Sequence, residues 1–208
     1  MLTFLVAANS LDTPLVARAV DVLRDRGVVA YPTDTFYGLA VDPRSPEATA
    51  KLFRVKRRSP STAIPLIAAS IDQVERVATC SPAEMRLAER FWPGPLTLVM
   101  PARPGLASVI LAGGTTVAVR VPAHPIARAL ASEFGFCITS TSANESGEPP
   151  AVSADDVVSA VGERIDLLLD AGPTPGGPPS TVVEMTADGP RLIRAGAVPW
   201  ERVLESLE

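Results

Sequence analysis

Short apolar runs alternate with amphipathic segments along nearly the whole chain of 208 residues. Residues 28–31 form one such run, which ends at Pro32, and residues 64–68, 96–100 and 117–121 repeat the pattern. A short apolar run that ends at a proline, a glycine or a polar turn is typical of a buried strand. The alternation therefore predicts an α/β fold in which an open, twisted, mixed sheet is flanked by helices.

The helices are predicted from capping residues at their starts and from glycine or proline at their ends. Ser45-Pro46-Glu47, for example, indicates a helix that runs to about Lys56. Two pairs have the spacing of a capping box: Ser70 with Gln73, and Ser81 with Glu84. Ser153 with Asp156 indicates the start of a further helix. The other predicted elements are helices at 15–26 (Thr13 as N-cap), 125–134 and 200–207 and strands at 136–139, 167–170, 181–185 and 191–193. No boundary or internal repeat is visible, so we expect one domain over residues 1–208.

Composition and charge exclude several classes of protein. No stretch approaches the roughly 20 apolar residues that cross a bilayer, and residues 1–10 lack the features of a signal peptide. We therefore expect a cytoplasmic protein without membrane contact. The formal net charge of −4 argues against strong electrostatic binding of nucleic acid, so any binding of RNA should be weak or indirect.

Several kinds of site are also excluded. Cys80 and Cys137 are isolated, which suggests neither a disulfide framework nor a thiolate metal cluster. The chain has no Gly-rich loop followed by Lys and Ser or Thr, and so it lacks a P-loop. The single histidine, His124, has no companions for a metal site or a catalytic triad. We predict no metal ligands from the chain.

Polar residues follow several of the predicted strands, where ligands of open α/β sheets usually bind. Thr33-Asp34-Thr35 comes after the first strand, although a helix cap explains it equally well. The segment 140–147, rich in Ser, Thr and Gly, could cradle an anion or form a plain turn. Ser180 lies at the end of a Pro/Gly-rich loop and by itself indicates only the start of a strand.

Cations lie near these segments in the sequence. Lys56 and Arg58 end a predicted helix, where positive charge also offsets the helix dipole. Arg120 follows Val117-Ala118-Val119 inside an apolar strand, so its guanidinium needs an anionic or carbonyl partner. Arg194 similarly follows an apolar pair.

Seven ordered segments between residue 31 and about residue 198 resemble the YrdC-like family of threonylcarbamoyl-AMP synthases, in its short, single-domain form. They read YPTDTFYGLAVD, LFRVKRR with IPLI, FWPGPLTLV, VAVRVPAHP, TSTSANESGEP, STVV and RLIRAGAV. The segment after Arg58 is slightly longer than in many relatives. The position after IPLI, where relatives often carry a histidine, reads Ala68-Ala69.

This resemblance implies a YrdC-like fold with a concave, positively charged cavity and a defined set of ligands. It implies that Lys56 and Arg58 are catalytic and that ATP, with Mg²⁺, is bound by Lys56, Arg58, Thr116, Ser142, Asn144, Pro150 and Arg194. Threonine would be bound by Thr33, Arg120, Ser140 and Ser180.

The implied activity is a nucleotidyl transfer. L-Threonine, bicarbonate and ATP would form threonylcarbamoyl-AMP and pyrophosphate, and a separate transferase complex would use the adenylate to modify tRNA next to the anticodon. Two alternatives stay open. One is a non-catalytic RNA-binding or translation-regulating module, which the net acidity disfavours. The other is an enzyme that adenylates carbamoyl phosphate, as in hydrogenase maturation, which ordinarily needs additional zinc-finger and acylphosphatase segments.

Overall fold

The chain alternates between helices and strands in the order that the apolar runs predict. The computed structural model describes residues 2–5 and 13–208; residue 1 and residues 6–12, part of the segment considered for a signal peptide, lie outside it. The described strands are β1 (Leu2–Leu5), β2 (Val29–Tyr31), β3 (Gly38–Ala40), β4 (Leu66–Ile67), β5 (Leu96–Pro101), β6 (Thr116–Arg120), β7 (Ile138–Thr139), β8 (Thr141–Ser142), β9 (Leu167–Asp170), β10 (Thr181–Thr186) and β11 (Gly189–Arg194). The α-helices are α1 (Thr13–Arg24), α2 (Pro46–Lys56), α3 (Ile71–Val74), α4 (Pro82–Phe91), α5 (Pro125–Phe134), α6 (Ala154–Val161) and α7 (Trp200–Glu205), and 3₁₀ turns lie at η1 (Ser108–Leu111) and η2 (Gly162–Arg164).

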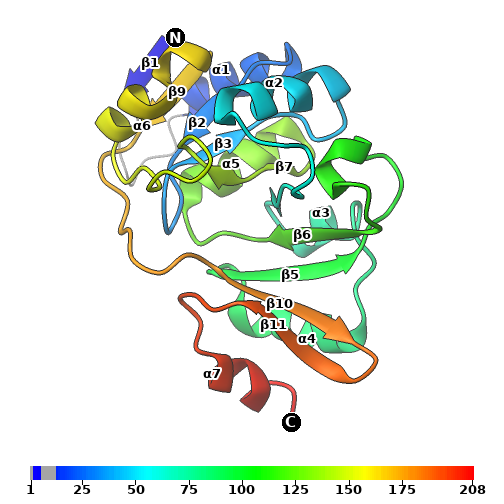
Figure 1. Cartoon of the computed structure of the whole chain (residues 1–208). Coiled ribbons are helices and arrows are strands. Elements are labelled where there is room, and N and C mark those ends of the chain that lie inside the picture. The colour runs from blue at the N-terminus through cyan, green and yellow to red at the C-terminus, as the bar shows by residue number, and fades with distance from the viewer. Residues whose placement is uncertain (1, 6–12) are drawn as a thin grey trace.

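The described strands form two mixed sheets, whereas the sequence predicted one. A five-stranded sheet has the order β1-β9-β2-β3-β8, and a six-stranded sheet has the order β11-β10-β5-β6-β4-β7. In Figure 1 the first sheet lies in the upper half and the second crosses the lower half. Each sheet contains parallel and antiparallel pairs, including the antiparallel pair β10–β11 at the carboxyl-terminal end. The mixed character is therefore confirmed, and the single sheet is corrected to two.

Ser140 alone separates a strand of one sheet from the next strand, which belongs to the other sheet. It lies between β7, which pairs with β4 in the six-stranded sheet, and β8, which pairs with β3 in the five-stranded sheet. Its backbone N–H donates to the Pro65 carbonyl at 2.7 Å. The carboxyl end of β7 is thereby held beside the end of the β2–β3 hairpin.

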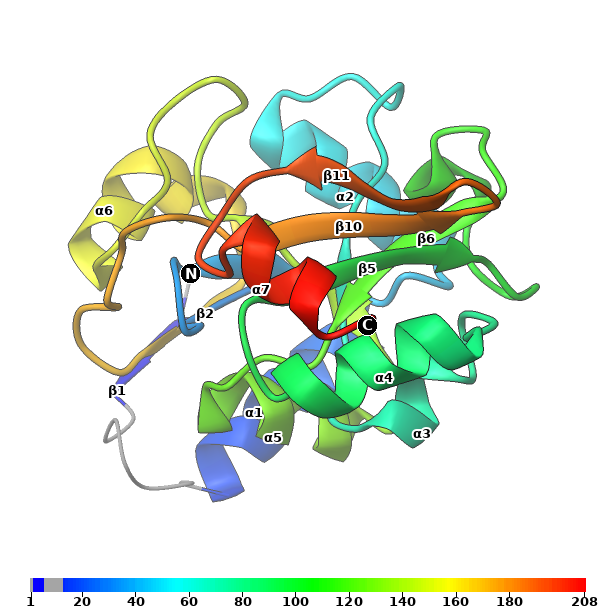
Figure 2. The same cartoon turned by 90° about the horizontal axis from the view of Figure 1, so that it is seen from below.

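Two apolar clusters hold the layers together. The larger one joins both sheets, with Leu39 of β3 and Leu98 of β5 fully buried. The smaller one lies under α1 and α5, which pack side by side in Figure 2. No helix in the described part of the chain is both long and apolar enough to span a bilayer.

The predicted helix caps are largely confirmed. Ser45 accepts a hydrogen bond from the Ala48 N–H at 3.2 Å, and both Ser81 and Ser153 form complete capping boxes. The box at Ser70 is wrong in one half, because the Gln73 side chain bonds Ala69 and Ala131 instead of returning to Ser70. Strands β1, β3 and β8 were not predicted, since β3 and β8 consist of short segments rich in glycine or hydroxyl residues.

Candidate functional site

The ends of several strands meet where the two sheets adjoin. β2 ends at Tyr31, β6 at Arg120 and β7 at Thr139. β5 runs antiparallel to β6, and β10 runs parallel to β5, so the start of β10 after Ser180 and the carboxyl end of β6 lie at the same edge of the sheet, on either side of β5. This topology brings Thr33, Arg120, Ser140 and Ser180 to one edge, as the rule for α/β sheets leads us to expect.

Arg120 is the buried cation at this edge, with 6% of its surface exposed. Its Nη1 lies 3.1 Å from Oδ1 of Asp34, and its Nη2 donates to the Thr33 hydroxyl at 3.4 Å. Among the described residues, neither Asp34 oxygen nor Arg120 Nη1 has a partner in hydrogen-bonding geometry. Buried polar groups of this kind are costly unless a water or a ligand completes them.

Tyr31 places Ser140 next to this pair. The Tyr31 side chain is fully buried, and its hydroxyl donates to the Thr139 carbonyl at 3.1 Å. Burial raises the pKa of Tyr31, while the Ser140 side chain and the charge of Arg120 act in the opposite direction. Ser140, which directly follows Thr139, therefore lies near the buried Tyr31 hydroxyl.

Ser180 and Arg194 form the second half of this edge. Arg194 donates to the Ser180 carbonyl at 2.7 Å and to its hydroxyl at 3.0 Å. Thr97 of β5 donates to the same hydroxyl at 2.8 Å. Partial burial, and after it the positive charge of Arg120, lower the pKa of Arg194.

Gly196 allows the loop after β11 to lie directly on the residues around Ser180. A Cβ atom at Gly196 would lie 2.5 Å from the Ser180 carbonyl carbon and from the Thr181 nitrogen, and closer still to the Pro179 oxygen. The loop is held there by a bond from the Ala197 N–H to the Pro179 carbonyl at 2.8 Å. The small residue after Arg194 thus sets the position of Ser180.

We expect Gly196→Ala to destabilise the protein by about 1–3 kcal/mol, because the new methyl group meets backbone atoms that cannot rotate away. It should also weaken ATP binding, since Ser180 and Arg194 separate when the loop moves. Urea unfolding and calorimetric ATP titration measure the two effects. Ala195→Ser, at the exposed neighbouring position, is the matched control, and wild-type values for Gly196→Ala would contradict this reading of the loop.

Lys56, Ser142 and Asn144 form a cluster on the other side of Ser140. Lys56 is 2% exposed, and its ammonium donates to the Ser142 carbonyl at 2.6 Å, the Asn144 carbonyl at 2.9 Å and Asn144 Oδ1 at 3.1 Å. The Ser142 hydroxyl also donates to Asn144 Oδ1, at 2.6 Å. All three ammonium hydrogens are therefore used within the protein, and they hold the turn 142–144 in place.

The other predicted ATP ligands lie around this cluster. Arg58 is half-buried, donates to the Ala63 carbonyl at 3.2 Å, and is close enough to lower the pKa of Lys56. Pro150 is exposed, in the segment that Asn144 anchors through the Glu148 carbonyl. Thr116 stands apart from Arg120, at the opposite end of β6 and about 13 Å away along the strand.

The two groups of residues adjoin through the segment 140–142. Ser140 belongs to the Arg120 side and Ser142 to the Lys56 side, and two residues span at most about 7 Å. The structure thus brings together Lys56, Ser142 and Asn144 on one side and Thr33, Arg120, Ser140, Ser180 and Arg194 on the other. Among the described residues, it shows no direct contact of Arg58, Thr116 or Pro150 with these two groups. In the described part of the chain, no group of three or more His, Cys, Asp and Glu side chains is placed to hold a metal ion.

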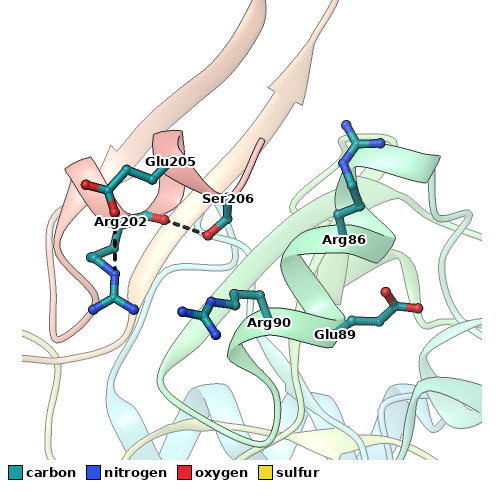
Figure 3. A pocket seen from close by; sticks show the side chains of 6 residues that line it. All are labelled: Arg86, Glu89, Arg90, Arg202, Glu205 and Ser206. Atoms are coloured by element: carbon teal, nitrogen blue, oxygen red, sulfur yellow. Dashed lines mark hydrogen bonds and ion pairs between the residues drawn. The ribbon is translucent and has the colours of Figure 1, made fainter. Parts of the chain in front are cut away.

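A separate hollow lies between α4 and α7. Figure 3 shows that side chains of both charges line it, with an Arg202–Glu205 ion pair at 3.7 Å on one wall. Its lining consists of Arg86, Glu89, Arg90, Arg202, Glu205 and Ser206. None of the predicted site residues belongs to it.

Sequence reasoning missed two residues of the site. Asp34 lies within a motif that a ligand site and a helix cap explain equally well, and nothing in the sequence marks it as the partner of Arg120. Thr97 lies within a predicted strand. No neighbouring residue in the sequence indicates its role, because its hydrogen-bond partner Ser180 is 83 positions away.

The fold and the site define a class of α/β protein in which buried cations and hydroxyl groups gather where two mixed sheets meet. Residues 21–196 match the Sua5/YciO/YrdC family, whose description is "Telomere recombination". The chain belongs to this family, as the seven motifs indicated.

Two proteins with similar sequences are named threonylcarbamoyl-AMP synthase. The chain is 38% identical over 196 residues to the threonylcarbamoyl-AMP synthase of Bacillus subtilis, which covers 93% of this chain and 57% of the relative. It is 44% identical over 153 residues to that of Alkalilimnicola ehrlichii, which covers 74% and 80%. The crystal structure of Pyrococcus abyssi Sua5 complexed with L-threonine superposes with a TM-score of 0.94 at 36% identity and covers all of this chain and 61% of that one. The chain thus spans little more than half the length of the Bacillus relative.

Proposed function

We propose that this protein is an L-threonylcarbamoyladenylate synthase, a nucleotidyltransferase that forms threonylcarbamoyl-AMP and pyrophosphate from L-threonine, bicarbonate and ATP. The observation that carries the proposal is the joint placement of Arg120, Ser180 and Arg194 at one edge, beside the Lys56–Asn144 cluster. Two adjoining sets of cations and hydroxyl groups suit two adjoining anionic ligands, an amino acid and a nucleotide. The names of the relatives agree with this pair of ligands.

Threonine would bind on the Arg120 side. A guanidinium makes strong, directional hydrogen bonds with a carboxylate, and Arg120 is the most deeply buried arginine of the site. Thr33, Ser140 and Ser180 surround it with hydroxyl groups. The threonine amine would take up carbon dioxide or bicarbonate to form a carbamate at this position.

ATP would bind on the Lys56 side, so that the carbamate oxygen attacks the α-phosphorus and pyrophosphate leaves. Arg58 and Arg194 would neutralise charge on the transferring group, and the ammonium of Lys56 would contribute positive charge while it holds the turn 142–144. Thr116 and Pro150 would contact the nucleotide further out. No protein nucleophile is required, because positioning and charge neutralisation account for phosphoryl-type transfer of this kind.

Mg²⁺ would accompany the triphosphate. This ion is commonly bound by phosphate oxygens and water with few protein ligands, and the described residues, which offer no acidic cluster, fit that mode. It would supply charge neutralisation at the phosphates. The positive charge of the cavity is part of the same proposal, supported by Lys56, Arg58, Arg120 and Arg194.

We further propose that the adenylate passes, in the cytosol, to a separate complex that transfers the threonylcarbamoyl group to tRNA. The net charge of −4 gives no support to the alternative of an RNA-binding module. The test is incubation with ATP, threonine and bicarbonate, each omitted in turn, with detection of the adenylate by mass spectrometry. We expect the product only in the complete mixture, and its absence there would refute the proposed activity.

A further inference from the structure

The Ser180 hydroxyl accepts two hydrogen bonds from within the protein. One comes from the Thr97 hydroxyl at 2.8 Å and the other from Nη2 of Arg194 at 3.0 Å. Thr97 is 3% exposed and Ser180 is 9% exposed. The contact is therefore shielded from the competing hydrogen bonds of bulk water.

This arrangement determines the direction in which Ser180 can bond a ligand. A hydroxyl group has two lone pairs and one hydrogen. Both lone pairs of Ser180 are occupied, so only its hydrogen is left for a third partner. That partner has to be an acceptor, such as a carboxylate oxygen, and an ammonium group is excluded.

The register between β5 and β10 fixes the position of Thr97 next to Ser180. Thr97 pairs with Val182 in the parallel ladder between β5 and β10, and the Thr181 N–H donates to the Pro95 carbonyl at 3.0 Å. The backbone at Gly196 packs closely against the Ser180 and Thr181 backbone. The backbone of Ser180 is thus fixed by its neighbours, and the bond from Thr97 orients its hydroxyl.

We propose that Thr97 is a positioning residue for the amino-acid site, which makes Ser180 a dedicated hydrogen-bond donor to the carboxylate of the substrate. The inference rests on the proposed function, since it assigns the Ser180 and Arg120 side to the amino acid. Because the Ser180 hydroxyl can then only donate, this position takes an acceptor such as the carboxylate of the substrate.

Thr97→Val tests the inference, because valine keeps the shape of threonine and removes the hydroxyl. We expect KM for threonine to rise about 3- to 10-fold, with kcat within 2-fold of wild type and with calorimetric ATP affinity unchanged. Thr97→Ser, which restores the hydroxyl, should return KM to near the wild-type value. An unchanged KM in Thr97→Val, or equal rises in both variants, would overturn the inference.

A double-variant cycle separates orientation of Ser180 from general packing. In a Ser180→Ala background the effect of Thr97→Val on threonine KM should vanish, because no hydroxyl is left to orient. A persisting effect would show that Thr97 acts through packing and would count against the inference. If Thr97→Val does not fold, Thr97→Ala provides the same comparison.

Failure of the proposed function gives a different result. If wild type forms no adenylate, calorimetric titration with threonine alone still compares wild type with Thr97→Val. Weaker threonine binding by the variant would uphold the role of Thr97 while the synthase activity fails. No threonine binding by wild type would overturn both.

Discussion

Arg120→Ala should lower threonine-dependent pyrophosphate release by a factor on the order of 10² to 10³, the usual cost of removing a preorganised donor from an active site. Arg120 is buried at the end of β6, and Arg194, another cation of the proposed site, cannot replace it without breaking its own bonds to Ser180. The loss should appear mainly in kcat/KM for threonine. Steady-state assays at varied threonine and saturating ATP measure it.

The same substitution should also destabilise the fold, by about 3 kcal/mol, because it leaves the Asp34 carboxylate largely buried without its positive partner. Combining Arg120→Met with Asp34→Asn removes both charges, so this double variant should regain stability in urea unfolding but not activity. Arg191→Ala, at an arginine 62% exposed and paired with Glu184, is the matched control. Near-normal release by folded Arg120→Ala would remove Arg120 from the site.

Lys56→Ala should have the second large effect, with pyrophosphate release almost abolished. The substitution removes a charge beside the proposed phosphate site and leaves the oxygens of Ser142 and Asn144 without their shared donor. Each buried acceptor that loses its partner costs about 1–3 kcal/mol, so the unfolding midpoint should fall as well. Lys51→Ala, which removes a half-exposed lysine of the same helix paired with Asp166, is the control, and an active Lys56→Ala enzyme would contradict this role.

The pH dependence gives a separate test of Lys56. Burial, with a further contribution from the charge of Arg58, lowers the pKa of Lys56 to about 8. Below that pH the ammonium is charged and donates three hydrogen bonds, and above it the neutral amine has only two hydrogens. We expect ATP affinity to fall as the pH rises through about 8. Lys56→Arg stays charged over this range, so a fall of the same size in that variant would assign the titration to another group.

Individual residues show which structural features a local sequence pattern can predict. Ser45, Ser81 and Ser153 could be predicted as caps because a cap and its partner lie within three residues of each other. The Gln73 side chain does not complete the predicted capping box, because it donates a hydrogen bond to the Ala131 carbonyl, 58 positions away. Strand β8 could not be distinguished from a loop, since two residues carry no periodicity and only pairing with β3 makes them a strand.

The sequence by itself determined where most helices and strands begin and end, the α/β class, and the motifs that carry the family. These depend on backbone conformation and on the spacing of apolar residues, which are local properties. Three features were decided by the tertiary structure alone. The strands on either side of Ser140 belong to different sheets, the Lys56 ammonium donates its hydrogen bonds to a turn 86 to 88 positions away, and the Thr97 hydroxyl bonds Ser180. Such partners depend on the register between distant strands, and that register is set by the packing of the whole core.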